Sequence, residues 1–244
     1  FNIETLQYDD DLLKIFNIPK IMLPEVKNSS DYYGETNLFS CGPIKIMGVA
    51  GDQQSALLGH QLIKKGGIKM TYGTGLFCLM NTGNNPVYSE KGILTTIGLT
   101  TKNEKYYALE GSVFIGGAAV QWLRDGLNLV ENAAETEEKA FFSKDESLIV
   151  VPAFAGLGTP YWDNECRGAI YGITRGTNKN DIVKATLEGI ALQAYDVIKT
   201  MIDDTKIQLN YLSVDGGASS NNYLMQFQSD IVPTKIIRPE VVET

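Results

Sequence analysis

The chain has 244 residues, of which 43% are hydrophobic and 20% are charged, with a formal net charge of −8 at pH 7. This composition is typical of a globular protein with a sizeable core, in one large domain or two smaller ones. The negative charge argues against nucleic acid or an anionic membrane as the main partner, and no apolar run has the length of a membrane span. Cys41, Cys78 and Cys166 match neither a disulfide framework nor a metal site, which favours a reduced, cytoplasmic location.

The first 36 residues carry no recognisable chemistry and are predicted to lie at the periphery of a domain. The acidic run 9–11 precedes an apolar pattern, so it is expected to cap and charge the start of a short helix. Pro19, Pro24 and the cluster 28–30 indicate loops. Because the chain opens without a methionine, we expect it to be a piece of a longer polypeptide.

A carboxylate stands between a strand and a helix in the next segment. The apolar run 44–50 predicts a buried strand, Gly51 a sharp turn, and the spacing from Gln53 onward a helix. Two interpretations of Asp52 remain open on position alone. It is either the N-cap of the helix, accepting free backbone N–H groups, or a general base facing a cleft.

Two strands joined by a Gly-Thr-Gly turn are predicted between residues 67 and 80. The turn at 73–75 is read either as an ordinary hairpin turn or as a loop whose backbone N–H groups and threonine hydroxyl approach a phosphate. Further strands at 93–100 and 106–110 complete an antiparallel meander.

A helix with glycines in its first turn is predicted to open within residues 111–123. Gly116 and Gly117 weaken such a turn, which suggests that another group packs closely against its backbone. Gln121 lies one turn beyond Gly117 on the same helix face, an arrangement that suits the edge of a flat ligand as well as tight helix packing.

The second half of the chain alternates between polar segments, irregular segments and regular elements. Residues 130–147 predict a solvated helix and loop, and residues 150–163 are too rich in Gly, Pro and aromatic residues for regular structure. A long amphipathic helix is expected at 180–203. It is followed by a strand at 209–214, the glycine turn 215–222 and a helix at 223–231. That turn is either an anion site or a capped strand-to-helix connection.

Three glycine turns at strand ends, one of them with a carboxylate, suit phosphoryl transfer. In that chemistry positioning and charge stabilisation dominate, and a single carboxylate accepts the proton of the attacking hydroxyl. No histidine or cysteine is placed for nucleophilic catalysis. The only histidine, His60, lies about two turns beyond Asp52 and is expected to be structural or on the surface.

At this point the sequence resembles the FGGY carbohydrate kinases, and within that family the members that act on glycerol. The resemblance covers nearly the whole chain. The matching motifs are Gly48–Gln54 (GVAGDQQ), Thr71–Gly75 (TYGTG), Met80–Gly83 (MNTG), Leu109–Ala118 (LEGSVFIGGA), Pro152–Phe154 (PAF), Gly158–Asp163 (GTPYWD), Gly168–Ile173 (GAIYGI), Asp181–Glu188 (DIVKATLE), Asp215–Ala218 (DGGA) and Met225–Asp230 (MQFQSD).

The resemblance implies ATP-dependent phosphorylation of glycerol to sn-glycerol 3-phosphate, with Mg²⁺ held largely by the nucleotide phosphates and water. Asp52 would be the catalytic base and would also contact glycerol, together with Gln53 and Phe77. The implied ATP or ADP contacts are Thr74, Gly117, Gln121, Gly217 and Asn221, and no metal-ligating residue is expected. The implied fold is α/β, actin-like and ribonuclease-H-like, with mixed sheets flanked by helices, and the full-length enzyme would be a homo-oligomer.

The sequence also departs from the family pattern. The first phosphate loop and the Arg-Glu pair that binds glycerol are absent, so residues 1–61 are interpreted as the end of the first domain and 62–244 as most of the second. We therefore expect this chain alone to be nearly inactive, which glycerol-dependent ADP formation by it would contradict. Residues 41–43 (CGP) replace a Gly-x-Arg bisphosphate site, and 37–39 (NLF) replace a loop with a phosphorylatable histidine, so neither control is expected.

Two other functions are compatible with the same turns. One is an actin-like or chaperone-like ATPase that phosphorylates no small molecule. The other is an FGGY kinase acting on a pentose or another polyol. Measuring how each polyol or pentose in a substrate panel stimulates ATP turnover distinguishes these two functions from phosphorylation of glycerol.

Overall fold

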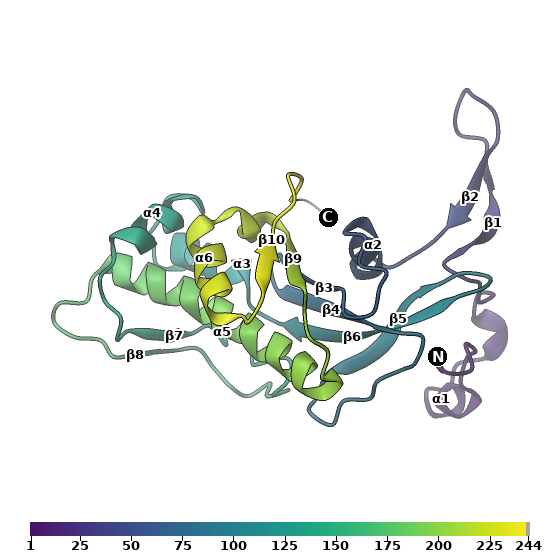
Figure 1. The fold of residues 1–244 in the computed structure, drawn as a ribbon, viewed down its shortest axis with the longest axis horizontal. Coiled ribbons are helices and arrows are strands. Elements are labelled where there is room, and N and C mark those ends of the chain that lie inside the picture. The colour runs from purple at the N-terminus through teal and green to yellow at the C-terminus, as the bar shows by residue number, and fades with distance from the viewer. Residues whose placement is uncertain (243–244) are drawn as a thin grey trace.

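The computed structural model describes residues 1–242, which form a main body around one sheet and a peripheral N-terminal segment (Figure 1). The sheet has six strands in the order β10-β9-β3-β4-β6-β5. Neighbours among β10, β9 and β3 run parallel, and neighbours from β3 to β5 run antiparallel. The strands are β3 (Ile68–Tyr72), β4 (Leu76–Gly83), β5 (Leu94–Thr100), β6 (Lys105–Val113), β9 (Tyr211–Asp215) and β10 (Lys235–Ile237).

This topology confirms the predicted fold. The order β6-β4-β3-β9-β10, with an antiparallel meander followed by two parallel strands, is that of a ribonuclease-H-like sheet, and β5 extends it at one edge. The predicted strands are all present, with bounds that differ by up to three residues. Strand β6 continues to Val113, so the glycine-rich helix begins only at Gly117.

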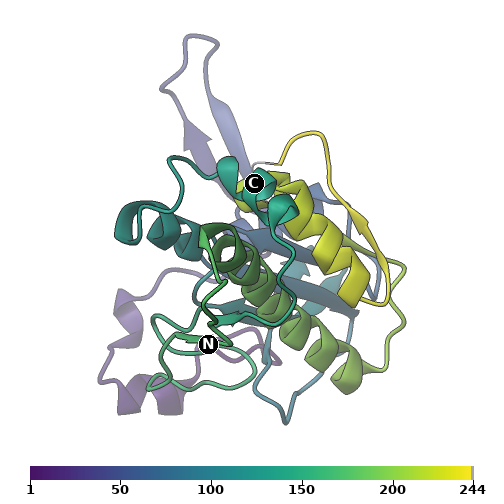
Figure 2. The ribbon, with the colours of Figure 1, turned by 90° about the vertical axis from the view of Figure 1, so that its left-hand side faces the viewer.

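One face of the sheet carries the main hydrophobic core. The long helix α5 (Lys179–Thr205) begins with a capping box between Asn178 and Asp181 and packs across this face. The apolar stripe that predicted it is buried, as Leu187, Ile190 and Val197 illustrate. Helices α4 (Glu135–Phe142) and α6 (Asn222–Ile231) lie against α5 at one end of the molecule, near α3 (Gly117–Gln121) and its π-helical continuation Trp122–Gly126 (Figure 2).

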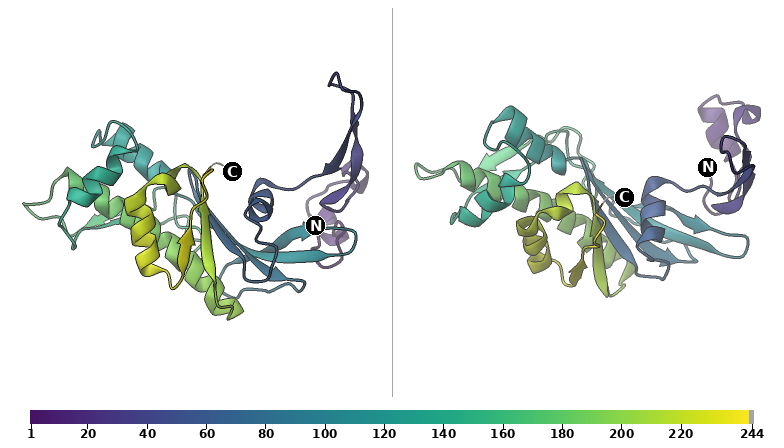
Figure 3. Two further views of the ribbon diagram at one scale, coloured as in Figure 1. Left: turned by 45° about the horizontal axis from the view of Figure 1, so that its top comes forward. Right: turned by 90° about the horizontal axis from the view of Figure 1, so that it is seen from above.

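The opposite face of the sheet is polar and is covered by the short helix α2 (Asp52–Gly59), as the two views of Figure 3 show. Leu57 of α2 and the following Leu62 are buried against Leu79 of β4. Because side chains alternate along a strand, this face of β3 presents Lys69 and Thr71, whereas its neighbours enter the core. The sheet is therefore apolar on the α5 face, whereas the face beneath α2 combines buried polar side chains with this small leucine cluster.

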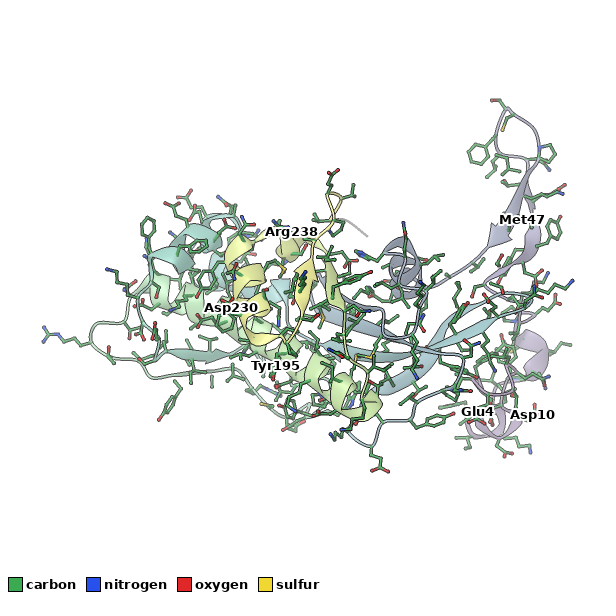
Figure 4. The ribbon with its side chains drawn as sticks, viewed as in Figure 1. Glu4, Asp10, Met47, Tyr195, Asp230 and Arg238 are labelled. Atoms are coloured by element: carbon green, nitrogen blue, oxygen red, sulfur yellow. The ribbon has the colours of Figure 1, made fainter. Side chains whose placement is uncertain are left out.

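The N-terminal segment lies beside β5 and carries α1 (Asp10–Ile15), the 3₁₀ turn Lys20–Met22 and the ribbon of β1 (Ser30–Thr36) and β2 (Ile44–Gly48). Asp9 caps α1 as predicted, accepting from two backbone N–H groups. The prediction of a buried strand at 44–50 was wrong. Strand β2 pairs only with β1, nothing in residues 1–242 covers the ribbon, and Met47 is 53% exposed (Figure 4).

Residues 143–178 connect α4 to α5 along the periphery. Strands β7 (Ile149–Val151) and β8 (Ala169–Tyr171) form a short antiparallel pair, which corrects the expectation that residues 150 and 151 are irregular. The remainder of the Gly- and Pro-rich segment has no regular strand or helix, as predicted. No helix among residues 1–242 combines the length and apolar character that crossing a membrane requires.

Candidate functional site

The Gly-Thr-Gly turn between β3 and β4 is tied to the start of α3. The N–H groups of Gly116 and Gly117 donate to the carbonyls of Thr74 and Gly73, each at 2.8 Å. A Cβ at Gly116 would lie 2.5 Å from a Leu76 methyl group, and one at Gly117 would lie 2.9 Å from the Gly73 oxygen. The two glycines are therefore explained by a close backbone approach, as the sequence indicated.

Beside this junction lies a cavity of about 970 Å³, enclosed by the β3–β4 turn, α3, α4 and the segment after β9. All five residues predicted to contact a nucleotide line this one cavity: Thr74, Gly117, Gln121, Gly217 and Asn221. They come from three segments separated by at least 40 residues of sequence, so their convergence is a result of the fold. Cavities of this volume are within the range of small-molecule sites.

The wall of the cavity opposite the glycine turns is formed by α4 and the loop before it, which sequence reasoning did not assign to the site. Phe141, Phe142 and Ala134 supply an apolar surface, and Thr136 and Glu137 supply polar groups. These residues were missed because a polar, acidic segment predicts a solvated helix. The signal that was present is the pair of adjacent phenylalanines, of which Phe141 packs edge-on against Tyr223.

Gly217 and Asn221 occupy different positions within the last glycine turn. Gly216 adopts φ +83°, a conformation that favours glycine, and Gly217 opens the 3₁₀ turn Gly217–Ser220 with open space around it. Asn221 is the N-cap of α6: its Oδ1 accepts from the Leu224 N–H at 2.9 Å, and its Nδ2 donates to Thr136 Oγ1 at 2.9 Å. The capping interpretation of this turn is confirmed, and the same asparagine joins α6 to α4 across the cavity.

On the other face of the sheet, Asp52 is the first residue of α2. The N-cap is Gly51, not Asp52, so the capping interpretation was wrong by one position. Within residues 1–242, the Asp52 carboxylate accepts one hydrogen bond, from the N–H of the following residue, Gln53, at 2.8 Å. The carboxylate lies near the start of a helix, where the partial positive charge of the helix dipole stabilises an anion.

A buried lysine, Lys69, bonds Gln53 and lies within the electrostatic influence of Asp52. The Lys69 ammonium donates to Gln53 Oε1 and, at 2.5 Å, to Thr71 Oγ1. Phe77 of β4 lies directly opposite Thr71 in the antiparallel pair, and its side chain is 37% exposed. The three residues predicted to contact the phosphoryl acceptor are therefore gathered at the start of α2, over one end of β3 and β4.

Lys69 is completely buried, although its polar character predicts an exposed side chain. Burial lowers the pKa of its ammonium, and the carboxylates of Asp215, Asp52 and Glu110 oppose this effect. Burial also raises the pKa of Glu110, and the negative charge of Asp52 adds to the increase. Sequence reasoning missed this cluster because β3 reveals only that Lys69 and Thr71 share a face, not which helix covers them.

His60, which follows the last residue of α2, has a structural role, as predicted. Its ring nitrogens bond two groups of β9: Nε2 lies 2.7 Å from Asp215 Oδ2 and Nδ1 lies 2.7 Å from Ser213 Oγ. Asp215 is buried and immediately precedes the Gly216-Gly217 turn, and its Oδ1 has no hydrogen-bond partner within residues 1–242. The helix is thus fastened to the sheet at both ends.

A ribonuclease-H-like sheet with glycine turns around a large cavity, and a carboxylate at the start of a neighbouring helix, is the arrangement of an actin-like ATPase domain. The models of the FGGY carbohydrate kinases match it in two parts: that of the C-terminal domain matches residues 68–244, and that of the N-terminal domain matches residues 1–59. The chain belongs to this family.

Individual relatives are similar over the whole chain. The glycerol kinase of Pasteurella multocida is 54% identical over 246 residues, which cover 100% of this chain and 49% of that protein. The glycerol kinase of Clostridium perfringens strain 13 is 54% identical over 247 residues, with the same coverage. The chain therefore spans about half the length of the curated relatives it matches.

A solved structure supports the same relationship. The crystal structure of Plasmodium falciparum glycerol kinase with ADP has a TM-score of 0.91 and is 39% identical, covering 100% of this chain and 49% of that one. A ligand-bound xylulose kinase from Lactobacillus acidophilus has a TM-score of 0.83 at 23% identity, which establishes the shared fold alone.

Proposed function

We propose that this chain supplies the nucleotide-binding half and the catalytic base of an ATP-dependent glycerol kinase, within a polypeptide of full family length. The observation that carries the proposal is that five residues assigned to the nucleotide line one cavity, in a chain 54% identical to glycerol kinases. We place the boundary between the two domains after residue 61. The proposed enzyme is cytoplasmic and homo-oligomeric.

In the proposed reaction, ATP occupies the cavity between α3, α4 and the Gly217 turn. The backbone of the β3–β4 turn and the Thr74 hydroxyl face the phosphates, and the apolar surface of Phe141 and Phe142 accommodates the base. The turn leads directly into β4, which carries Phe77 on the acceptor side. The same hairpin therefore connects the nucleotide cavity with the acceptor cluster, by which we mean Asp52, Gln53 and Phe77 together with Lys69 and Thr71.

The acceptor glycerol would lie at the start of α2, with its carbon chain against Phe77 and its hydroxyls near Asp52 and Gln53. Asp52 accepts the proton of the hydroxyl whose oxygen attacks the γ-phosphorus, while the bond from that phosphorus to the bridging oxygen of ADP breaks. The carboxylate is available for this task because its one hydrogen bond within residues 1–242 is to its neighbour's N–H.

Magnesium is the implied metal of such a reaction, and the donor set of this chain fits one that arrives with the nucleotide. Among residues 1–242, no three His, Cys, Asp or Glu side chains are grouped so that they could bind a metal ion. Mg²⁺ prefers water and phosphate oxygens with few carboxylates, and when bound it neutralises phosphate charge.

The test is ADP release by the full-length polypeptide with ATP and Mg²⁺, offered glycerol, pentoses and longer polyols in parallel. Glycerol is expected to stimulate turnover most. Asp52→Asn keeps the size and the hydrogen bond but removes the base, and is expected to lower kcat by about 10²–10⁴-fold with little change in the KM for ATP. Turnover indifferent to every polyol would refute the kinase, and an unaffected Asp52→Asn enzyme would refute the assigned base.

A further inference from the structure

The acceptor cluster contains one residue that no motif singles out, the buried Lys69. Its side chain rises from the polar face of β3 to the underside of α2 and has no exposed surface. Burying an ammonium is strongly unfavourable unless its charge and its donors are satisfied. Here Gln53 and Thr71 accept hydrogen bonds from it, and Asp215, Asp52 and Glu110 surround it with negative charge.

The contact between Lys69 and Gln53 determines which way the Gln53 amide faces. An ammonium is only a donor, so the amide atom next to it must be the oxygen, Oε1. The Thr71 hydroxyl approaches the same oxygen at 3.4 Å and reinforces this orientation. The side-chain hydrogen bonds of Gln53 within residues 1–242 all involve Oε1, so Nε2 points away from the lysine with its donors unused.

We propose that Lys69 is a positioning residue that holds Gln53 as a hydrogen-bond donor, so that the site selects an acceptor with a hydroxyl oxygen in front of Nε2. This inference rests on the proposed function and deepens it, because it names the polarity that Gln53 presents to the polyol. Asp52, the adjacent residue, accepts a hydrogen bond from an acceptor hydroxyl, whereas Gln53 donates a hydrogen bond to a hydroxyl oxygen. Because one hydroxyl can both donate and accept, the proposal includes the assignment of different hydroxyls to the two residues: the attacking hydroxyl to Asp52 and a second hydroxyl to Gln53. A diol that lacks the second hydroxyl then loses the contact with Gln53.

The consequence is measurable as discrimination between substrates. A hydrogen bond of ordinary strength contributes about 0.5–1.5 kcal/mol, which corresponds to roughly 2- to 12-fold in kcat/KM. We therefore expect the unmodified enzyme to prefer glycerol over 1,2-propanediol or 1,3-propanediol, whichever lacks the hydroxyl bound by Gln53. A residue that merely supports the fold would affect all three acceptors equally.

The experiment measures kcat/KM for glycerol and both propanediols with the full-length polypeptide and two variants. Lys69→Met removes the ammonium and keeps the length of the side chain, so the amide loses its fixed orientation. Gln53→Glu keeps an acceptor for Lys69 and removes the donor. Both are expected to remove the part of the preference for glycerol that this hydrogen bond supplies, a loss of roughly 2- to 12-fold. Lys199→Met, at an exposed lysine of α5 paired with Asp203, is the control and is expected to leave the preference unchanged.

Each other outcome contradicts a stated part of the reasoning. An unchanged preference in Lys69→Met, with kcat/KM reduced equally for all acceptors, shows a purely structural lysine and overturns the proposal. An unchanged preference in Gln53→Glu overturns it as well, and this variant decides the question if Lys69→Met does not fold. If the unmodified enzyme phosphorylates none of the three acceptors, the proposed function itself fails, which is seen before any variant is compared.

Discussion

The five residues proposed to contact the nucleotide all belong to this chain, which leads to a prediction about nucleotide binding by the 244-residue protein itself. Gly217 lies on the cavity wall, and a Cβ built on it would meet no atom within 4 Å. Its φ is outside the left-handed region, so a larger residue is accommodated without backbone strain. Gly217→Val should therefore fold normally and place an isopropyl group in the space that the nucleotide is proposed to occupy.

The expected size of the effect follows from overpacking. Forcing extra methyl groups into an occupied site costs about 1–3 kcal/mol, or roughly 5- to 150-fold in the Kd for ADP. At a concentration one hundred times the Kd, ADP stabilises the unmodified chain by about 2.7 kcal/mol. For a chain of this size, that raises Tm by about 5–10 °C. A hundredfold weaker affinity reduces the stabilisation to about 0.4 kcal/mol, a barely measurable shift in Tm.

Thermal unfolding with and without ADP is the assay, supported by calorimetric titration of the Kd. Gly176→Val is the matched control, because Gly176 lies in an exposed loop away from the cavity and its Cβ would lie 3.7 Å from Thr174 Oγ1, an ordinary contact. The control should keep the full ADP-induced shift. An equal shift in Gly217→Val and the unmodified chain would show that the nucleotide does not approach this turn.

Two further predictions concern titratable groups. The pKa of Glu110 is raised above its ordinary value by burial and then by Asp52, so its contribution to stability is complete below about pH 4.5 and is lost as pH rises through the native-state pKa. Glu110→Gln, which is neutral throughout, should match the unmodified chain in urea unfolding at pH 4 and exceed it at pH 8; an equal difference at both pH values would contradict this. Burial raises the pKa of Cys78 to about 12, whereas Cys41 is exposed. A thiol reagent at pH 8 should modify Cys41 rapidly and Cys78 only after unfolding. Rapid modification of Cys78 in the folded chain would show that its thiol is accessible to solvent and would contradict this prediction.

The sequence predicted most of the fold because its regular elements carry strong local patterns. The alternation in β3, the apolar run of β4, the glycines between them and the apolar stripe of α5 each indicate an element without reference to the rest of the chain. The residues that line the cavity were predicted through the resemblance to the FGGY kinases, because each glycine turn by itself also allowed a purely structural interpretation. Gly116 and Gly117 are required by the approach of the β3–β4 turn, so the local signal and the tertiary contact agree.

The features that were missed depend on which elements pack together, and no local pattern carries that information. Strand β2 has the apolar composition of a buried strand, yet nothing in residues 1–242 covers it. Lys69 shows the opposite discrepancy, because a lysine predicts an exposed side chain whereas α2 buries this one. The polar segment with α4 forms a cavity wall because α4 packs on α5 and α6, a contact determined by the topology rather than by its own sequence.

Helix α2 connects the proposed acceptor cluster with the cavity proposed to bind the nucleotide. At its start, Gln53 is held by Lys69 of β3; just beyond its end, His60 bonds Ser213 and Asp215 of β9, and Asp215 leads into the Gly217 turn. A hydrogen bond to a charged group contributes about 1.5–3 kcal/mol, and removing it would leave a buried carboxylate unpaired. Displacing Asp52 relative to Gly217 therefore requires breaking one of these two attachments.

The helix belongs to the region matched by the N-terminal domain model, but it is attached to the sheet of the C-terminal domain. These attachments hold Asp52 and the Gly217 turn on the same sheet, whereas just before the helix Val49 is exposed and Gly51 is the N-cap.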